Sequence, residues 1–246
     1  MRRLISIISF ILLFLVGANG QTRTVQNRPY ADLRPFHFGI LLGTHLQDLK
    51  FVNVGMQTIT DDDGTPHQRL ITTDQSRWDA GFQVGVLGEF RLTENFQLRL
   101  APSLFFGSRH IKFQDMMADN AVQGERHQDM KTVYIATSAE LLFDGPRLNN
   151  VRPYLLGGLS PMLNLDGKTH DYLKLKKYDL LAEVGMGVDI YLPYFKLRPE
   201  LKYMFSLLNS LDKKHAKRLD DKSMLPYTNS VKEARSHIIA LTFYFE

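Results

Sequence analysis

The chain has 246 residues, with 30 Lys and Arg against 26 Asp and Glu, and it contains no cysteine. That length is comfortable for a single domain. The near balance of charge, without a basic face interleaved with aromatic residues, gives no support for a nucleic-acid partner. The absence of cysteine excludes disulfides and thiolate metal sites.

The first 20 residues have the pattern of a cleaved signal peptide. Arg2 and Arg3 form a basic start, residues 4–16 are apolar apart from serines, and small residues end the segment at Gly20. The apolar run is too short to cross a bilayer of about 30 Å as a stable helix, which favours cleavage over an uncleaved anchor. We therefore predict a signal peptide over residues 1–20 and a nearly neutral exported chain that begins at Gln21.

Polar residues and two prolines, Pro29 and Pro35, mark residues 21–35 as a predicted loose periplasmic lead-in. From residue 36 to residue 246, eight stretches alternate apolar and polar side chains. Period-two alternation predicts strands, because successive side chains of a strand point to opposite faces. The predicted strands are residues 36–46, 78–92, 96–107, 132–143, 151–163, 178–192, 195–207 and 237–246.

The connections between these strands alternate in length. Short turns are predicted at residues 93–95, 144–150 and 192–194, and loops 1 to 4 at residues 47–77, 108–131, 164–177 and 209–235. Short turns at one end and long loops at the other are typical of outer-membrane barrels. The sequence therefore predicts an all-β fold, an eight-stranded antiparallel up-and-down transmembrane β-barrel over residues 36–246. Its short turns would be periplasmic and its four long loops extracellular.

Proline and glycine occur inside the predicted strands. Since proline removes a donor from the strand ladder, we expect bulges or strand ends near Pro102, Pro153, Pro161 and Pro199. Mid-strand glycines weaken a flat sheet but allow it to bend tightly, as closure into a barrel requires.

Alternation alone does not decide which face meets lipid, and a soluble barrel of the lipocalin kind would reverse the faces. The apolar face holds Leu, Ile, Val and Phe along all eight strands, whereas the opposite face mixes charges, glycines and hydroxyls, as a polar lumen does. Aromatic residues gather at strand ends, where interfacial girdles belong. Residues 243–246 also resemble the C-terminal aromatic signal of outer-membrane barrels, although Glu246 follows the last Phe. These observations favour the outer membrane.

Charged residues fall on the predicted inner face. An eight-stranded barrel is just wide enough to be filled by side chains, and opposite charges packed there would neutralise each other. The width favours a salt-bridged plug over a narrow ion path. The predicted lumen charge network is Glu89, Arg91, Arg99, Glu140, Arg152, Glu183, Asp189, Arg198, Glu200 and Lys202.

Other chemistry is weakly supported. Paired carboxylates could serve a lipid-modifying barrel enzyme, but such chemistry needs a nucleophile, a base and an orienting group within reach. The sequence has no Gly-x-Ser-x-Gly elbow. Residues 61–64, Asp-Asp-Asp-Gly, could bind Ca²⁺, but they lack the spaced oxygens of a calcium loop. We predict no catalytic residue, no cofactor and no metal site.

Loop 4 carries a compact basic run, which is the predicted interface. Lys and Arg hold phosphates and acidic partners, so this run could contact lipopolysaccharide or an acidic protein. A merely solvated loop is an equally good interpretation. The residues are Lys213, Lys214, His215, Lys217 and Arg218.

Three segments resemble PorT-type outer-membrane proteins of Bacteroidetes. They are His37-Phe38-Gly39-Ile40 with Gly43, residues 152–158 (Arg-Pro-Tyr-Leu-Leu-Gly-Gly), and residues 185–201 around the third short turn. The last segment is the most specific, and the likeness covers nearly the whole mature chain. The resemblance implies an outer-membrane barrel required for protein export by the type IX secretion system. Its partners would be outer-membrane lipid, lipopolysaccharide and other secretion subunits.

An eight-stranded barrel is too narrow to pass a folded cargo. The resemblance therefore implies a role beside the translocon, in assembly, as a scaffold or in cargo handling, and supplies no catalytic residue. Two alternatives stay open from the residues themselves. One is a small barrel whose long loops bind host surfaces or lipopolysaccharide, and the other is the lipid-modifying enzyme.

Overall fold

The computed structural model describes residues 26–60, 66–118, 124–165, 171–219 and 221–246. The predicted signal peptide, residues 1–20, and the Asp-Asp-Asp-Gly segment, residues 61–64, lie outside the described residues. Within the described residues, no helix has both the length and the apolar character needed to cross a membrane.

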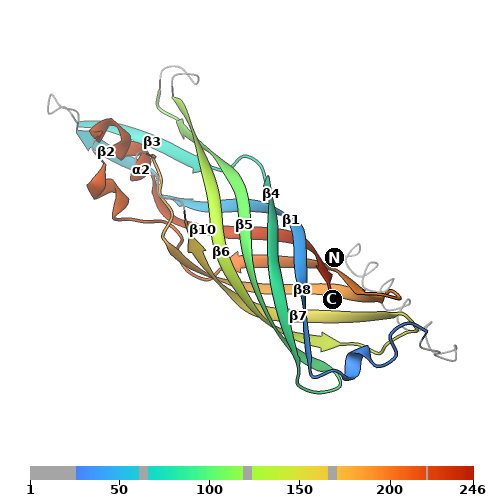
Figure 1. Ribbon diagram of the computed structural model, residues 1–246. Helices are drawn as coiled ribbons and strands as arrows, with labels where there is room; N and C mark the ends of the chain where they lie inside the picture. The colour runs from blue at the N-terminus through green and yellow to red at the C-terminus, as the bar shows by residue number, and fades with distance from the viewer. Residues whose placement is uncertain (1–25, 61–65, 119–123, 166–170, 220) are drawn as a thin grey trace, which may run out of the picture.

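Eight of the described strands close into one ring (Figure 1). Neighbouring strands are antiparallel, and pairing between β5 and β6 closes the order β5-β4-β1-β10-β9-β8-β7-β6. The prediction of an eight-stranded up-and-down barrel is confirmed. The ring strands are β1 (Phe36–Asn53), β4 (Asp79–Arg91), β5 (Phe96–Asp115), β6 (Glu125–Asp144), β7 (Val151–Asn164), β8 (Tyr178–Tyr191), β9 (Lys196–Ser206) and β10 (Val231–Phe245).

The loops are more ordered than the sequence indicated. Loop 1 contains a hairpin of β2 (Met56–Thr60) and β3 (Pro66–Asp74), and β3 continues by pairing with β5. Short helical turns also occur outside the ring. They are η1 (Ala31–Leu33) in the lead-in, and η2 (His215–Arg218), η3 (Lys222–Met224) and α2 (Leu225–Thr228) in loop 4.

The outward face of the ring is apolar and the inward face is charged. Phe38 is 77% exposed and Leu201 51%, whereas the side chains of Arg99 and Arg198 are fully buried. In water this arrangement would expose a continuous apolar belt around the molecule, far larger than the patches of soluble proteins. In a bilayer the same belt meets hydrocarbon. The prediction of a lipid-facing apolar surface is confirmed, and the lipocalin-like alternative is wrong.

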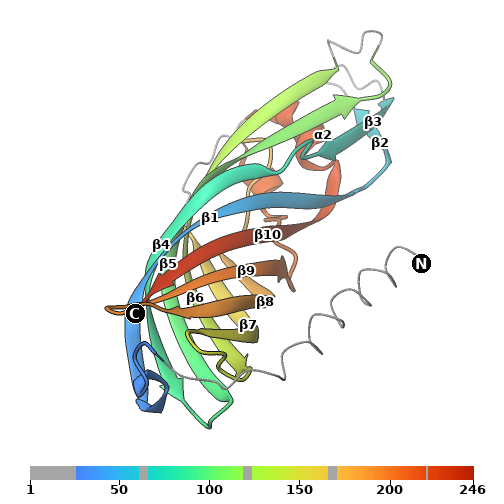
Figure 2. The ribbon, with the colours of Figure 1, turned by 90° about the vertical axis from the view of Figure 1, so that its right-hand side faces the viewer.

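Strands β5 and β6 are 20 residues long, whereas the predicted strands had 12. At about 3.4 Å per residue each spans roughly 65 Å, which exceeds a hydrocarbon core of about 30 Å even at a 45° tilt. Figure 2 shows β5 and β6 rising well past β7, β8 and β9 at the end that holds β2, β3 and α2. Part of the predicted loop 2 is therefore a β-hairpin outside the membrane.

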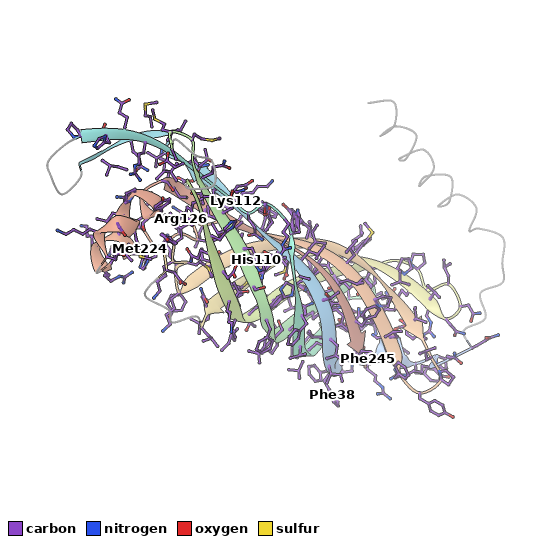
Figure 3. The ribbon with its side chains drawn as sticks, turned by 90° about the horizontal axis from the view of Figure 1, so that it is seen from above. Phe38, His110, Lys112, Arg126, Met224 and Phe245 are labelled. Atoms are coloured by element: carbon purple, nitrogen blue, oxygen red, sulfur yellow. The ribbon has the colours of Figure 1, made fainter. Side chains whose placement is uncertain are left out.

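Side chains on the outer face of this extension are polar and paired. Figure 3 places His110 and Lys112 on it, far along the molecule from Phe38. Arg126, in contrast, is paired with Phe113 and lies on the opposite face of the hairpin. The Lys112 ammonium lies 2.8 Å from Glu125, and its hydrogen bond holds the pKa of that half-buried carboxyl below its usual value. These groups require contact with water, so the apolar belt ends below them.

The expectation of a nearby strand end is confirmed at Pro153, which lies two residues from the start of β7, where the pairing of β6 with β7 ends at Tyr154. In the strand pairings that the structure describes, no bulge occurs at the other three prolines. The described ladders open locally at Pro102 between β4 and β5, at Pro161 between β6 and β7 and at Pro199 between β8 and β9, and each resumes in the same register. The strand on the other side still pairs with each proline position, which holds the segment in place. Within the described strand pairs, the register shift lies elsewhere, between Val52 and Asn53.

Candidate functional site

Arg99 of β5 lies at the centre of the charged lumen. Its Nε donates to Glu89 at 3.1 Å, and its Nη1 donates to Glu140 at 3.0 Å and to Glu200 at 2.6 Å. These partners come from β4, β6 and β9, so one guanidinium joins both walls of the ring. Strand alternation brings the four side chains inward at the same level, and their burial is complete.

Arg198 of β9 forms a second centre nearer the short turns. Its Nη1 lies 2.6 Å from Glu89 and 2.6 Å from the side chain of Glu246, and its Nε lies 2.5 Å from Asp189. The Lys196 ammonium also contacts Glu246, at 2.5 Å. The sequence prediction omitted Glu246, although it continues the inward positions of β10 beyond Tyr244.

Lys202 joins Glu183, the remaining carboxylate, to the centre through Glu140. Its ammonium lies 2.7 Å from Glu140 and 3.7 Å from Glu183. Two phenols missed by the prediction, Tyr154 and Tyr244, donate to Glu200 at 2.8 and 3.0 Å. We call the following set the lumen network: Glu89, Arg99, Glu140, Glu183, Asp189, Lys196, Arg198, Glu200, Lys202 and Glu246.

Eight of the ten residues predicted for the lumen lie in this network, and Arg91 and Arg152 do not. Arg152 contacts Asp144 at 3.6 Å and Asp32 at 3.9 Å, below the network and nearer the short turns. Arg91 is half-buried at the end of β4, where its Nε donates to the carbonyl of Thr93. Among the described residues it has no ion pair, which differs from the prediction.

The lead-in is tied across the end of the barrel that carries the short turns, which corrects the expectation of a loose segment. Arg147 donates to Asp32 at 3.1 Å and stacks 3.5 Å over the ring of Tyr191, whose hydroxyl also donates to Asp32. Asn27 donates to the carbonyl of Tyr191 at 2.9 Å, and Arg28 donates to the carbonyl of Glu246 at 3.1 Å. These partners are more than 100 residues apart in sequence.

Arg147→Ala is expected to release this segment, because it removes both the ion pair to Asp32 and the stacking on Tyr191. The measurement is the rate of tryptic cleavage after Arg28 in the refolded barrel, which should rise at least several-fold. Arg91→Ala is the control, since Arg91 also lies near a short turn and, in the described residues, only its backbone N–H contacts the lead-in, at the carbonyl of Pro35, a bond that alanine keeps. Equal cleavage rates in the Arg147→Ala variant and the wild type would show that the tie does not depend on this side chain.

Beyond the membrane the inward face of the extended strands is apolar. Leu173 and Leu175 of loop 3 and Tyr227 of loop 4 pack against it, and the ring of Phe113 lies 5.3 Å from Tyr172 and 5.8 Å from Tyr227. Loops 3 and 4 are also joined by a β-bridge between Leu175 and Leu211. We call the buried cluster the outer core: Leu49, Ile71, Ile111, Phe113, Met130, Leu173, Leu175, Leu211, Tyr227, Val231 and Ala234.

The predicted interface run does not present one continuous basic face. Lys213, Lys214 and Lys217 are exposed, but His215 is buried with its Nε2 2.6 Å from the carbonyl of Asp171. Arg218 is paired with Asp212.

A hollow of about 200 Å³, which we call the basic hollow, lies where loops 3 and 4 meet β10. Of the predicted run, only Lys213 lines it. Its lining residues are Leu173, Lys174, Leu211, Asp212, Lys213, Ala216, Thr228, Asn229, Val231 and Lys232.

In the part of the chain that the structure describes, no group of three or more His, Cys, Asp or Glu side chains is arranged to hold a metal ion. At both ends the lumen is covered. The lead-in lies across the end with the short turns, and the outer core fills the other. Partners can reach the extended strands and long loops at one end and the tied lead-in and short turns at the other.

A closed ring with an apolar belt outside and an ion-paired lumen inside defines an integral β-barrel of the outer membrane. The chain belongs to the outer membrane protein beta-barrel domain family, whose model matches residues 20–212. No curated protein matches the chain.

Two solved structures are similar to this barrel. Neisserial surface protein A is 14% identical, with 86% of this chain and 98% of that chain covered and a TM-score of 0.41. Ail, the attachment invasion locus protein of Yersinia pestis, crystallised with the heparin analogue sucrose octasulfate, is 13% identical. That match covers 86% of this chain and 99% of Ail, with a TM-score of 0.37.

Proposed function

We propose that this protein is a non-enzymatic outer-membrane barrel that binds lipopolysaccharide or another anionic surface component through loops 3 and 4. The observation that carries the proposal is the combination of a filled lumen with basic loops whose described parts pack on the outer core. Because Arg99, Arg109 and Arg198 are fully buried inside the barrel, a transport role would require the lumen to be rebuilt. A binding role through the loops requires no such rearrangement of the lumen.

Charge distinguishes these two loops from the others. Residues 164–177 contain four lysines against two aspartates, and residues 209–235 contain seven Lys and Arg against four acidic residues. Residues 47–77, in contrast, contain more acidic than basic residues. Packing on the outer core fixes the described parts of loops 3 and 4 before a ligand arrives, which lowers the entropy cost of binding.

A second candidate is a subunit of type IX secretion. The segment that favours it is residues 185–201, which runs from β8 through the third short turn into β9 and carries the most specific likeness to PorT-type proteins. In this role the barrel would act beside the translocon, and the tied lead-in and short turns would face periplasmic partners.

One experiment separates the two functions. The gene is deleted in the source bacterium and restored with the full chain, and two quantities are measured. These are binding of the cells to an immobilised sulfated polysaccharide and the amount of secreted protease in the medium. Loss of binding with normal secretion supports the surface-binding role. Retention of proteases in the cells supports the secretion role and contradicts the first proposal.

A further inference from the structure

Three lysines from three separate segments converge on the basic hollow. Lys174 comes from loop 3, Lys213 from the residues of loop 4 just before η2, and Lys232 is the second residue of β10. Among the described residues, none of the three has an ion pair. The carboxylate in the lining, Asp212, is already engaged by Arg218 and by the backbone N–H of Lys214. The hollow therefore carries uncompensated positive charge.

The backbone structure around the hollow positions the segments that carry these lysines. Val52 pairs with Glu233 and Asn53 with Val231, so Lys232 is the extra residue of a β-bulge. A bulge re-aims the side chain of the residue that it inserts, and bulges often lie beside binding sites. The backbone segments that carry Lys174 and Lys213 are joined by the bond from the Asp212 N–H to the carbonyl of Lys174, at 2.9 Å.

The distance of the hollow from the apolar belt indicates which layer of the cell surface surrounds it. Lys232 lies seven residues along β10 beyond Ile239, an exposed apolar residue of the belt. At about 3.4 Å per residue and a 45° tilt this is roughly 17 Å above the belt. The headgroup layer on one side of a bilayer is about 5–8 Å thick. The lysines therefore lie above the lipid headgroups, in the layer of surface saccharides.

Resting on the proposed binding function, we propose that the basic hollow binds a phosphate or sulfate group carried by a surface saccharide. A volume of about 200 Å³ is below the roughly 300–1,000 Å³ of pockets that enclose drug-sized ligands. It admits one charged group while the rest of the saccharide lies outside. Ammonium groups and the amide of Asn229 are donors, which suits the acceptor oxygens of such an ester.

A larger hollow of about 480 Å³ lies between β1 and β3, beside Phe51 and Thr72. It contains Lys112, whose ammonium is already 2.8 Å from Glu125. Its size exceeds that of the basic hollow, but its charge is balanced. We therefore select the basic hollow as the anion site because its lysines have no ion pair in the part of the chain that the structure describes, although its volume is the smaller of the two.

The test uses the full mature chain refolded in a neutral detergent and titrated with two probes by calorimetry. The probes are sucrose octasulfate and purified lipopolysaccharide, the latter before and after chemical removal of its phosphates. The triple variant Lys174→Gln, Lys213→Gln, Lys232→Gln is expected to weaken binding about tenfold or more, since charge-assisted hydrogen bonds contribute more than neutral ones. Wild-type affinity should also fall steeply as salt rises.

A matched variant removes the same charge from the same part of the molecule but outside the hollow: Lys177→Gln, Lys222→Gln, Arg235→Gln. We expect it to lose less than about threefold, because its charges act only through screened long-range attraction. Both triple variants alter exposed or half-exposed side chains, so both should retain the faster gel migration of an unboiled barrel.

Equal losses in the two triple variants would overturn the hollow as the binding site and leave the proposed loop-binding function standing. Failure of the wild type to bind either probe would overturn both. Binding of lipopolysaccharide that is abolished by phosphate removal supports the hollow and assigns the ligand to the bacterial surface. Binding of sucrose octasulfate alone supports the hollow and assigns it to a sulfated saccharide from outside.

Discussion

Arg99→Met is expected to destabilise the folded barrel by about 3–5 kcal/mol, because it removes one partner of a buried ion-pair network and leaves the others uncompensated. Among the described residues, the lumen network holds six carboxylates and four cationic groups. Removal of Arg99 increases this excess of negative charge. Glu200 also loses a partner at 2.6 Å, and two phenols cannot supply a compensating charge.

The measurement is reversible urea unfolding of the barrel in lipid vesicles, followed by gel migration of the unboiled protein. Arg91→Met is the matched control, since it removes the same side chain from an adjacent strand at a position outside the network. We expect its free energy of unfolding to change by less than about 0.5 kcal/mol, as for most surface substitutions. Equal effects of the two substitutions would show that the network does not stabilise the barrel.

Arg99→Lys separates charge from geometry. An ammonium keeps the positive charge but cannot form the forked contacts to Glu89, Glu140 and Glu200 at once. The loss of stability should lie between those of Arg99→Met and Arg91→Met. This variant also keeps the test informative if Arg99→Met fails to fold.

Strand alternation predicted the ring and most of the lumen network. In a bilayer the apolar side chains of an alternating strand face lipid, so its polar side chains must face the lumen. It failed at the membrane boundary for a physical reason. Below the boundary the apolar residues, such as Leu104 and Phe106, face outward, whereas above it Ile111 and Phe113 face inward and Lys112 faces water. The period-two pattern continues, but its polarity is reversed. The prediction assumed that the apolar residues stay on one face along the whole strand. It therefore ended the strands too early and missed the outer core.

Long-range contacts were the other limit. Nothing local in residues 21–35 indicates that Asp32 pairs with Arg147, because that contact exists only when the barrel is closed. Likewise, the bulge that aims Lys232 depends on how β10 pairs with β1, not on the sequence around Lys232. The sequence alone showed the basic run in loop 4. Of its predicted interface residues, however, only Lys213 lines the hollow, and this depends on how loops 3 and 4 fold.

Leu201→Arg is expected to destabilise the barrel in a bilayer by about 2–4 kcal/mol, the cost of a cationic side chain near the midplane of a lipid-facing strand. Leu201 is the middle residue of β9, pairs with Leu241 and Met186, and is 51% exposed. Tyr194→Arg is the control, because Tyr194 is 93% exposed in the short turn between β8 and β9. There the arginine stays in water, and the change should be close to zero.

Both variants are measured by urea unfolding in vesicles and again in a mild detergent. The penalty at Leu201 should be smaller in detergent, since micelles deform around a charge more easily than a bilayer. In a soluble barrel, an exposed Leu→Arg substitution would be nearly neutral in any solvent. A loss of stability in the bilayer that occurs at Leu201 but not at Tyr194 therefore depends on lipid contact. Equal, small effects at both positions would contradict the lipid-facing assignment of β9. The two positions lie seven residues apart, so the comparison also tests how sharply the apolar belt ends.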